Sequence, residues 1–211
     1  HTWAMASCLL CSGGLVSAQA ASAVAPAISG GVEYFHLKEL DSNGSRLLAE
    51  TGTRYTISAA LDNASRYDPL TPWLYHAEIT AYTGQVDYDG LSQSIDPTEN
   101  NLPFGTDTNY LGARAEAQLG YQVKPAALPH ALQLIAGLGV DGWRRRIHTG
   151  FTANGIQVSG TEEVYRVFYG KAALGIADLW SGGWHNQIQA GVKLPIRIVE
   201  DVNLRAVGYD N

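Results

Sequence analysis

Apolar and polar residues alternate with a period of two along most of the chain, a pattern typical of β-strands. The clearest case lies between Leu111 and Tyr121, where Leu, Ala and Tyr occupy the odd positions and Gly, Arg, Glu and Gln the even ones. No segment has convincing helical spacing. The pattern predicts strands at residues 31–40, 46–61, 73–88, 109–121, 131–147, 162–180 and 184–198.

The connections between these segments are too short for the helical crossovers that parallel pairing needs, so we expect an antiparallel up-and-down sheet. Gly, Asn, Asp and Pro mark the turns, and residues 87–107 read as a long polar loop. No linker divides the chain. A single β-domain over residues 21–211 follows.

The polar faces of the strands carry charges at mid-strand, which raises the question of which solvent each face meets. The charged positions are Glu78, Arg114, Glu116, Lys171 and Lys193. In an outer-membrane barrel the apolar face meets lipid and the charges point into the lumen. We therefore interpret these residues as a lumen charge network. A soluble sandwich with the charges in water has the same periodicity and stays open as an alternative.

Residues 1–20 resemble the tail of a secretory signal peptide. An apolar stretch from Trp3 to Val16 precedes the small residues Ala18-Gln19-Ala20, which fit an A-x-A cleavage site. Cys8 and Cys11, the two cysteines of the chain, both lie in this segment. The exported chain is then expected to have no disulfide, and no run of eighteen apolar residues follows that would form a transmembrane helix.

Bacterial single-chain barrels have an even number of strands, starting at eight. Because the pattern predicts an odd number here, we expect the eighth strand beyond Asn211 and interpret the chain as a C-terminally truncated fragment. The first and last predicted strands would then have open edges. Aromatic residues near strand ends, namely Trp73, Tyr75, Tyr121 and Trp184, fit a membrane-interface girdle.

Together with the alternating strands, three stretches carry a resemblance: "GQVDYDG" (84–90), "TDTNYLGARAEAQLGY" (106–121) and "AGLGVDGWRRR" (136–146). Over residues 31–198 the chain resembles small outer-membrane β-barrel proteins of Gram-negative bacteria, of the OmpA-like or porin-like type. The resemblance implies an antiparallel up-and-down transmembrane β-barrel in the cell outer membrane. It also implies the lipid bilayer, lipopolysaccharide and the outer-membrane assembly machinery as partners. It implies an activity less firmly, because such barrels serve many functions.

The net charge of −6 argues against a nucleic-acid partner. The histidines show no metal-ligand spacing, so we predict no metal and no cofactor. Alternation turns Arg144 and Arg146 to one face and Arg145 to the other, and we consider Arg144 and Arg146 as contacts for lipid phosphates. An acid–base pair of His148 with an aspartate of the 87–107 region is the one enzymatic arrangement considered.

The expected function is a non-enzymatic barrel with a filled or narrow polar lumen and a structural or surface-interaction role, because an eight-stranded barrel encloses only enough space for side chains. One alternative is a secreted, lipocalin-like binder of small ligands, which would need an apolar inner face. The other is an outer-membrane enzyme with its site at the rim.

Overall fold

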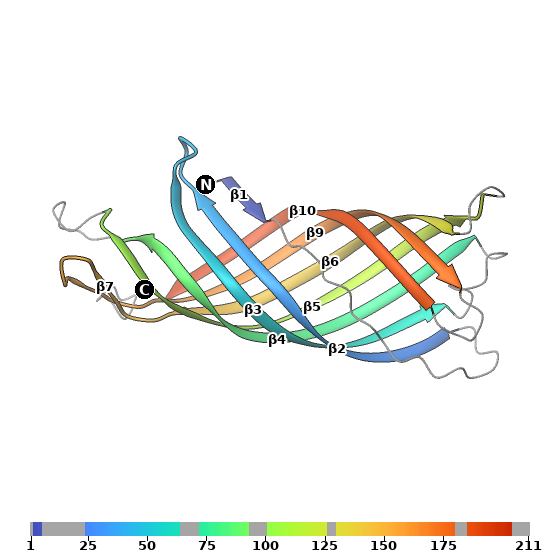
Figure 1. The fold of residues 1–211 in the computed structure, drawn as a ribbon, viewed down its shortest axis with the longest axis horizontal. Helices are drawn as coiled ribbons and strands as arrows, with labels where there is room; N and C mark the ends of the chain where they lie inside the picture. Colours follow the sequence, from blue (N-terminus) through green and yellow to red (C-terminus); the bar gives the residue numbers. More distant parts are fainter. Residues whose placement is uncertain are drawn as a thin grey trace.

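The computed structural model describes residues 2–5, 24–63, 72–92, 101–125, 130–179 and 185–203, and these form a single sheet (Figure 1). The sheet is antiparallel and follows the order β1-β2-β3-β4-β5-β6-β9-β10. Its long strands are β2 (Val24–Leu40), β3 (Arg46–Asn63), β4 (Trp73–Leu91), β5 (Pro103–Val123), β6 (Ala131–Ile147), β9 (Glu162–Leu179) and β10 (His185–Asn203). The short ones are β1 (Thr2–Met5), β7 (Gly150–Thr152) and β8 (Gln157–Val158).

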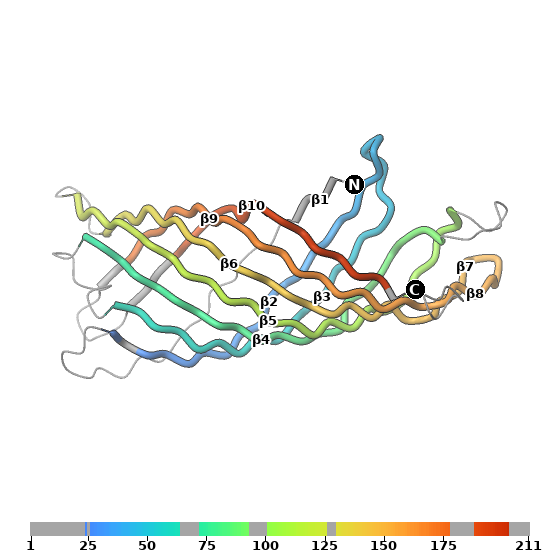
Figure 2. Tube along the Cα trace, turned by 180° about the vertical axis from the view of Figure 1, so that it is seen from behind, coloured from blue at the N-terminus to red at the C-terminus, as the bar shows by residue number. Residues whose placement is uncertain are grey.

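The predicted all-β, antiparallel, up-and-down architecture is confirmed. Each long strand pairs with its neighbours in the chain, and Figure 2 shows the strands running obliquely along the long axis of the molecule. The hairpin of β7 and β8 lies off this path and pairs with the start of β5. None of the described residues belong to a helix long and apolar enough to span a membrane.

The prediction of a polar loop over residues 87–107 is wrong at both ends. β4 continues to Leu91 and β5 already begins at Pro103, so that Asp87 pairs with Asp107. The alternation continues through these residues, but here the apolar side chains lie on the buried face and the polar ones on the exposed face. Val86 and Tyr88 are buried, while the aspartates beside them are exposed. Residues 93–100 lie outside the described residues.

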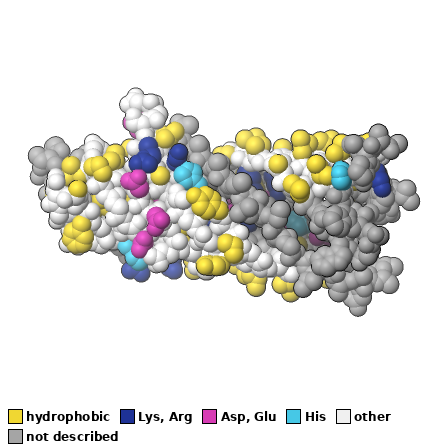
Figure 3. All heavy atoms as spheres, viewed as in Figure 1, with side chains coloured by type: hydrophobic (Ala, Val, Ile, Leu, Met, Phe, Trp, Pro, Cys, Tyr) yellow, Lys and Arg dark blue, Asp and Glu magenta, His cyan; other side chains and the backbone are white. Residues whose placement is uncertain are grey.

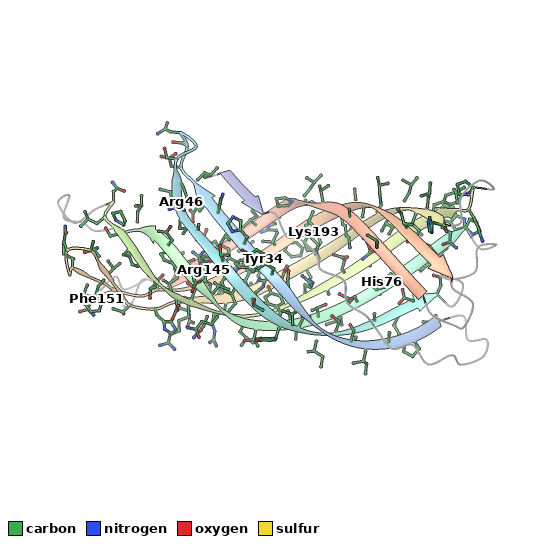
Figure 4. All side chains as sticks on the ribbon, viewed as in Figure 1. Tyr34, Arg46, His76, Arg145, Phe151 and Lys193 are labelled. Carbon is green, nitrogen blue, oxygen red and sulfur yellow. The ribbon has the colours of Figure 1, made fainter. Side chains whose placement is uncertain are left out.

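The sheet is strongly curled, as ion pairs across its inner face demonstrate. Arg114 on β5 lies 3.7 Å from Glu33 on β2, although β3 and β4 separate these strands. Arg145 on β6 likewise reaches Glu50 on β3, at 3.4 Å. In a flat sheet such strands are about 14 Å apart. The sheet therefore has a concave face, which carries these residues, and a convex face (Figure 4).

The curled sheet is not closed by hydrogen bonds in the part of the chain that the structure describes. No backbone ladder there joins β10 to β2 or to β1. β1 pairs with β2 only at Leu37–Leu40, and Figure 1 shows it between β2 and β10. The predicted signal peptide lies outside the described residues except for β1, and a strand beyond Asn211 remains a prediction.

Turn chemistry places the hairpin between β2 and β3 where the sequence predicts it. The Asp41 carboxylate accepts hydrogen bonds from the backbone N–H groups of Asn43 and Ser45, each at 2.8 Å. Gly44 has φ +82°, a conformation that glycine adopts without strain. At the same end of the molecule, which Arg46 marks in Figure 4, the concave face encloses a hydrophobic core. This core consists of Phe35, Leu37, Leu48, Val86, Tyr88, Phe104, Tyr110 and Ile147.

Candidate functional site

The convex face carries an apolar belt around the half of the molecule that ends at Trp73 and Tyr121. The belt consists of side chains that a water-soluble sheet would cover, such as Ile28 at 77% exposure and Leu138 at 65%. Figure 3 shows hydrophobic side chains along the upper and lower outline of that half. The larger members of the belt are Val24, Ile28, Val32, Tyr34, Tyr55, Ile57, Leu61, Trp73, Tyr75, Ile79, Leu111, Leu119, Tyr121, Val123, Leu132, Leu134, Leu138, Phe168, Leu174, Ile176, Ile188, Val192, Leu194 and Ile196.

The belt ends at the same level along neighbouring strands. At this level the convex face of a strand changes from apolar to polar, and its concave face changes from polar to apolar. On β4 the convex face is apolar at Trp73, Tyr75 and Ile79, and then becomes polar at Gln85 and Asp87. β6 changes in the same way, from Leu134 and Leu138 to Arg144 and Arg146. The concave face changes in the opposite sense, from Glu78 and Thr80 to Val86 and Tyr88 on β4. The outer surface thus has two zones that suit different surroundings.

Behind the belt, the concave face is polar, and Glu116 lies at the centre of one of its clusters. The Glu116 carboxylate accepts a hydrogen bond from Lys171 Nζ at 2.7 Å, and Lys193 Nζ lies 3.0 Å from its other oxygen. Tyr169 Oη donates to the same carboxylate at 2.8 Å. Two cations and a hydroxyl from β9 and β10 therefore compensate one largely buried carboxylate on β5.

Arg114, the next residue on the same face of β5, belongs to a second group of charges. It lies 3.7 Å from Glu33, which also forms a 3.1 Å ion pair with Arg54. Tyr82 Oη donates to the Asp141 carboxylate at 2.7 Å, which extends the group from β4 to β6. The Arg54 guanidinium lies over the ring of Tyr82, 4.4 Å from its centroid.

Glu78 lies on the concave face directly opposite Glu116, but its side chain has other partners. It accepts a hydrogen bond from Thr80 Oγ1 at 2.7 Å, and His76 Nε2 lies 3.8 Å away. His76 in turn pairs with Asp62 through Nδ1, at 2.9 Å. The structure therefore brings Glu116, Lys171 and Lys193 into direct contact, and places Arg114 and Glu78 on the same face with other partners.

Beyond the belt, a further buried cluster forms around Arg145. Its guanidinium donates to Glu163 through Nε at 2.9 Å and lies 3.4 Å from Glu50. Glu50 has 0% exposure and Arg145 2%. Tyr110 donates a hydrogen bond to Glu50. Tyr165 Oη lies within hydrogen-bond distance of both Glu163 and Glu200, at 2.9 and 2.8 Å.

The charges of this cluster shift the pKa of Glu39 on β2. Burial raises the pKa of Glu39, and the carboxylates of Glu163, Glu200 and Glu50 raise it further, while Arg145 opposes the rise. Glu200 belongs to β10, and its hydrogen bond with Tyr165 on β9 brings a residue of β10 into the same cluster.

Glycines on the concave face make room for the tyrosine rings that reach these charges. A Cβ added at Gly139 would lie 2.5 Å from Cζ of Tyr169, the residue opposite it on β9. Val or Leu at such a position would displace the ring from Glu116. The small residues are therefore part of the charge network, even though they contribute no polar atom to it.

We expect Gly139→Ala to lower the free energy of unfolding by about 1–3 kcal/mol, because the added methyl overlaps the Tyr169 ring. Gly170→Ala is the matched control, since its Cβ would meet only Ile196 Cδ1, at 4.0 Å on the convex face. Its effect should stay within about 0.5 kcal/mol. Urea unfolding, followed by tryptophan fluorescence, measures both. Equal effects of the two variants would contradict the close packing of Tyr169 on Gly139.

Several charged residues of the concave face were not predicted as site residues: Glu33, Glu50, Arg54, Asp141, Arg145, Glu163 and Glu200. They can be identified from their odd or even position along the strand, which decides the face of the sheet on which a side chain lies. Arg54 and Glu50 have the opposite parity to the exposed Tyr55 and Ile57 on β3, and so share the face of the predicted charges. Parity does predict the arginine run correctly, since Arg145 is buried while Arg144 and Arg146 are exposed.

The residues considered for catalysis do not form an acid–base pair in the described part of the chain. His148 Nε2 accepts a hydrogen bond from the Asn109 amide at 3.0 Å. The Asp107 carboxylate instead accepts one from Gln85, at 2.7 Å. Within the described ranges, no group of three or more His, Cys, Asp or Glu side chains is arranged to hold a metal ion.

The predicted aromatic residues lie at the end of the belt where β4 begins and β5 ends. Trp73 and Tyr121 face each other across the two strands, with ring centroids 5.2 Å apart in an edge-to-face arrangement. Both rings are about half exposed, as is Tyr75. Trp184 lies outside the described residues.

Comparison of the chain with protein-family models, with curated proteins and with solved structures found no significant match.

Proposed function

We propose that the chain forms a small transmembrane β-barrel of a bacterial outer membrane, with a polar interior filled by side chains and a structural or surface-interaction role. The observation that carries the proposal is the apolar belt on the convex face, backed by buried charges on the concave face. A soluble sheet buries its apolar face and exposes its charges. Hydrocarbon outside reverses this preference, because apolar side chains then face lipid and charges must pair inside.

The reversal of alternation within single strands supports the same proposal. Outside the belt, the convex face is polar and the concave face holds a hydrophobic core, as expected for a segment surrounded by water. Within the belt, the segments from Trp73 to Ala81 on β4 and from Leu132 to Val140 on β6 are nine residues long, the lower end of the 9–11 residues that a tilted strand needs to cross a bilayer. We propose that the belt spans the membrane and that the polar zone projects beyond it.

A strand between β10 and β2 would close the barrel. Since every neighbouring pair is antiparallel, β2 and β10 run in the same direction, and direct pairing between them would be parallel. One further strand between them restores antiparallel pairing throughout. Closure of this kind removes unpaired edges, which lipid does not tolerate.

The filled interior favours a structural role over transport. Paired side chains from β2, β5, β9 and β10 occupy the concave face behind the belt, as the contacts of Arg114 and Glu116 illustrate. A lipocalin-like binder would need an apolar surface there. A rim enzyme would need a catalytic pair, and the ring of His148 contacts the Asn109 amide instead of an aspartate carboxylate. We therefore propose no enzymatic activity and no cofactor.

Expression of the full chain in a Gram-negative host tests the proposal. We expect the protein in the outer-membrane fraction, in agreement with an export signal in residues 1–20, and we expect the unheated protein to migrate differently from the boiled protein on gels. Liposomes that contain the protein should not swell in an isosmotic solution of a small sugar.

Recovery in the soluble periplasmic fraction, with the same mobility before and after boiling, would contradict the membrane assignment. Rapid swelling of the liposomes would contradict the filled interior alone. The two parts of the proposal can therefore fail separately.

A further inference from the structure

A group of four arginines lies on the convex face directly beyond the apolar belt. Arg144 and Arg146 come from β6, Arg166 from β9 and Arg197 from β10, and all four are exposed. Arg144 is opposite Val164, two residues from Arg166. Arg166 is opposite Val199, and Arg197 is opposite Phe168. Such diagonal neighbours lie about 7–8 Å apart, within the joint reach of arginine side chains.

Among the described residues no ion pair is formed by these four arginines, and the same holds for the isolated, exposed Lys38 and Lys124. What sets the arginines apart is that they lie together on neighbouring strands. Arg54, Arg114, Arg145, Lys171 and Lys193 pair with carboxylates on the concave face, and the exposed Arg46 pairs with Asp89 at 2.7 Å. Two carboxylates share the convex face with them: Glu162 is opposite Arg146, and Asp201 is opposite Val164. Neither forms an ion pair with the four arginines, and two carboxylates balance at most half of their charge. The group keeps a local excess of positive charge on a chain whose net charge is −6.

The surface directly below the arginines is apolar. Phe168 follows Arg166 on the same face of β9, and Leu194 and Ile196 precede Arg197 on β10. A ligand that satisfies both surfaces has a phosphate at the height of the guanidinium groups and hydrocarbon chains against the belt. Arginine suits this role because its planar group binds phosphate through two parallel hydrogen bonds.

We infer that Arg144, Arg146, Arg166 and Arg197 form a binding site for the phosphate headgroup of a membrane lipid whose acyl chains lie on the apolar belt. The inference rests on the proposed membrane location and adds to it a lipid class and the residues that select it. A soluble phosphate compound lacks the acyl chains and therefore uses only half of the site.

Lipid retention by the purified full chain in a non-ionic detergent tests the inference. Dioleoyl phosphatidic acid and dioleoyl phosphatidylcholine are added separately, and the lipid bound to each protein is measured by native mass spectrometry. We expect roughly tenfold preference for phosphatidic acid, and its loss in the Arg144→Gln/Arg166→Gln variant. Arg46→Gln/Lys124→Gln removes the same charge elsewhere and should keep the preference.

Competition with inorganic phosphate and a lysine double variant test the inference further. Displacement of phosphatidic acid by an equal concentration of inorganic phosphate would mean a free-anion site and overturn the inference. An equal loss in the two glutamine double variants would also overturn the inference, because it would indicate non-specific charge attraction. Arg144→Lys/Arg166→Lys keeps the charge, and a reduced preference in it supports bidentate recognition, whereas unchanged preference overturns that part. All three double variants should show the mobility shift on heating that marks folded protein.

Flotation with vesicles of phosphatidylcholine alone measures membrane insertion independently of any preference for one phospholipid. Protein that floats but selects no lipid overturns the inference and leaves the proposed function standing. Protein that selects phosphatidic acid in detergent but fails to float contradicts the proposed function instead.

Discussion

Arg145→Met is expected to lower the free energy of unfolding by about 3–5 kcal/mol, because it leaves buried carboxylates without their cation. Glu50 and Glu163 both face the Arg145 guanidinium, and Glu50 has no exposure to solvent. The remaining donors are neutral hydroxyls, from Tyr110 to Glu50 and from Tyr165 and Thr161 to Glu163. They satisfy oxygen atoms but do not balance the charge. Urea or guanidinium unfolding in detergent micelles measures the loss.

Two variants control this result. Arg146→Met removes the next arginine, which is exposed on the convex face, and should change the free energy of unfolding by no more than about 0.5 kcal/mol. Glu50→Gln/Arg145→Met/Glu163→Gln removes both carboxylates with the cation and should recover most of the stability. If the triple variant were as unstable as Arg145→Met, lost packing rather than an unbalanced charge would explain the effect.

Leu138→Arg is expected to cost about 2–4 kcal/mol when unfolding is measured in lipid vesicles, because a cation would then enter the hydrocarbon. Leu138 lies near the middle of the belt on β6, opposite Ala117 and Gly170, and is 65% exposed. For a face that meets water, the same change would be close to neutral. This substitution therefore distinguishes a lipid-facing belt from a water-facing one.

Thr53→Arg provides the matched control on the polar zone of the convex face. Thr53 is exposed and lies one convex-facing position beyond Tyr55, the last belt residue of β3, and its cross-strand neighbours Tyr34 and Gln85 carry no charge. Arginine there should stay within about 0.5 kcal/mol of the original chain. A neutral result for Leu138→Arg beside a neutral Thr53→Arg would argue against membrane insertion. A large loss for both would mean that the polar zone also lies in the membrane.

Alternation is a reliable guide to strands but a poor guide to where they end. The predicted strand 73–88 continues to Leu91, and the one expected from Asn109 begins at Pro103. The extra residues look like loop because aspartates and glycines occupy their exposed positions, while Val86, Tyr88 and Phe104 supply a buried face. A strand that passes from one surrounding to another reverses its pattern, and a search for one constant pattern stops at the reversal.

The sequence predicts on which face of the sheet the charged residues lie, but not which residues they pair with. Mid-strand charges identified Arg114, Glu116, Lys171 and Lys193 because a charge in an alternating strand is conspicuous. Glu33, Glu50 and Arg54 were missed, since their strands also contain other polar residues. Pairing across the concave face depends on curvature, and the sequence of β5 contains no sign that Arg114 meets Glu33 on β2.

The sequence by itself determined that the chain forms antiparallel strands and which residues share a face. It also determined that the side chain of Arg145 lies on the opposite face to those of Arg144 and Arg146. These properties follow from the two-residue period of a strand, which is local. Only the tertiary structure decided which face is enclosed, which charges meet, and where the apolar belt stops. These depend on how far the sheet curls, and curling sums the twist of many strands that the chain brings together over long sequence distances.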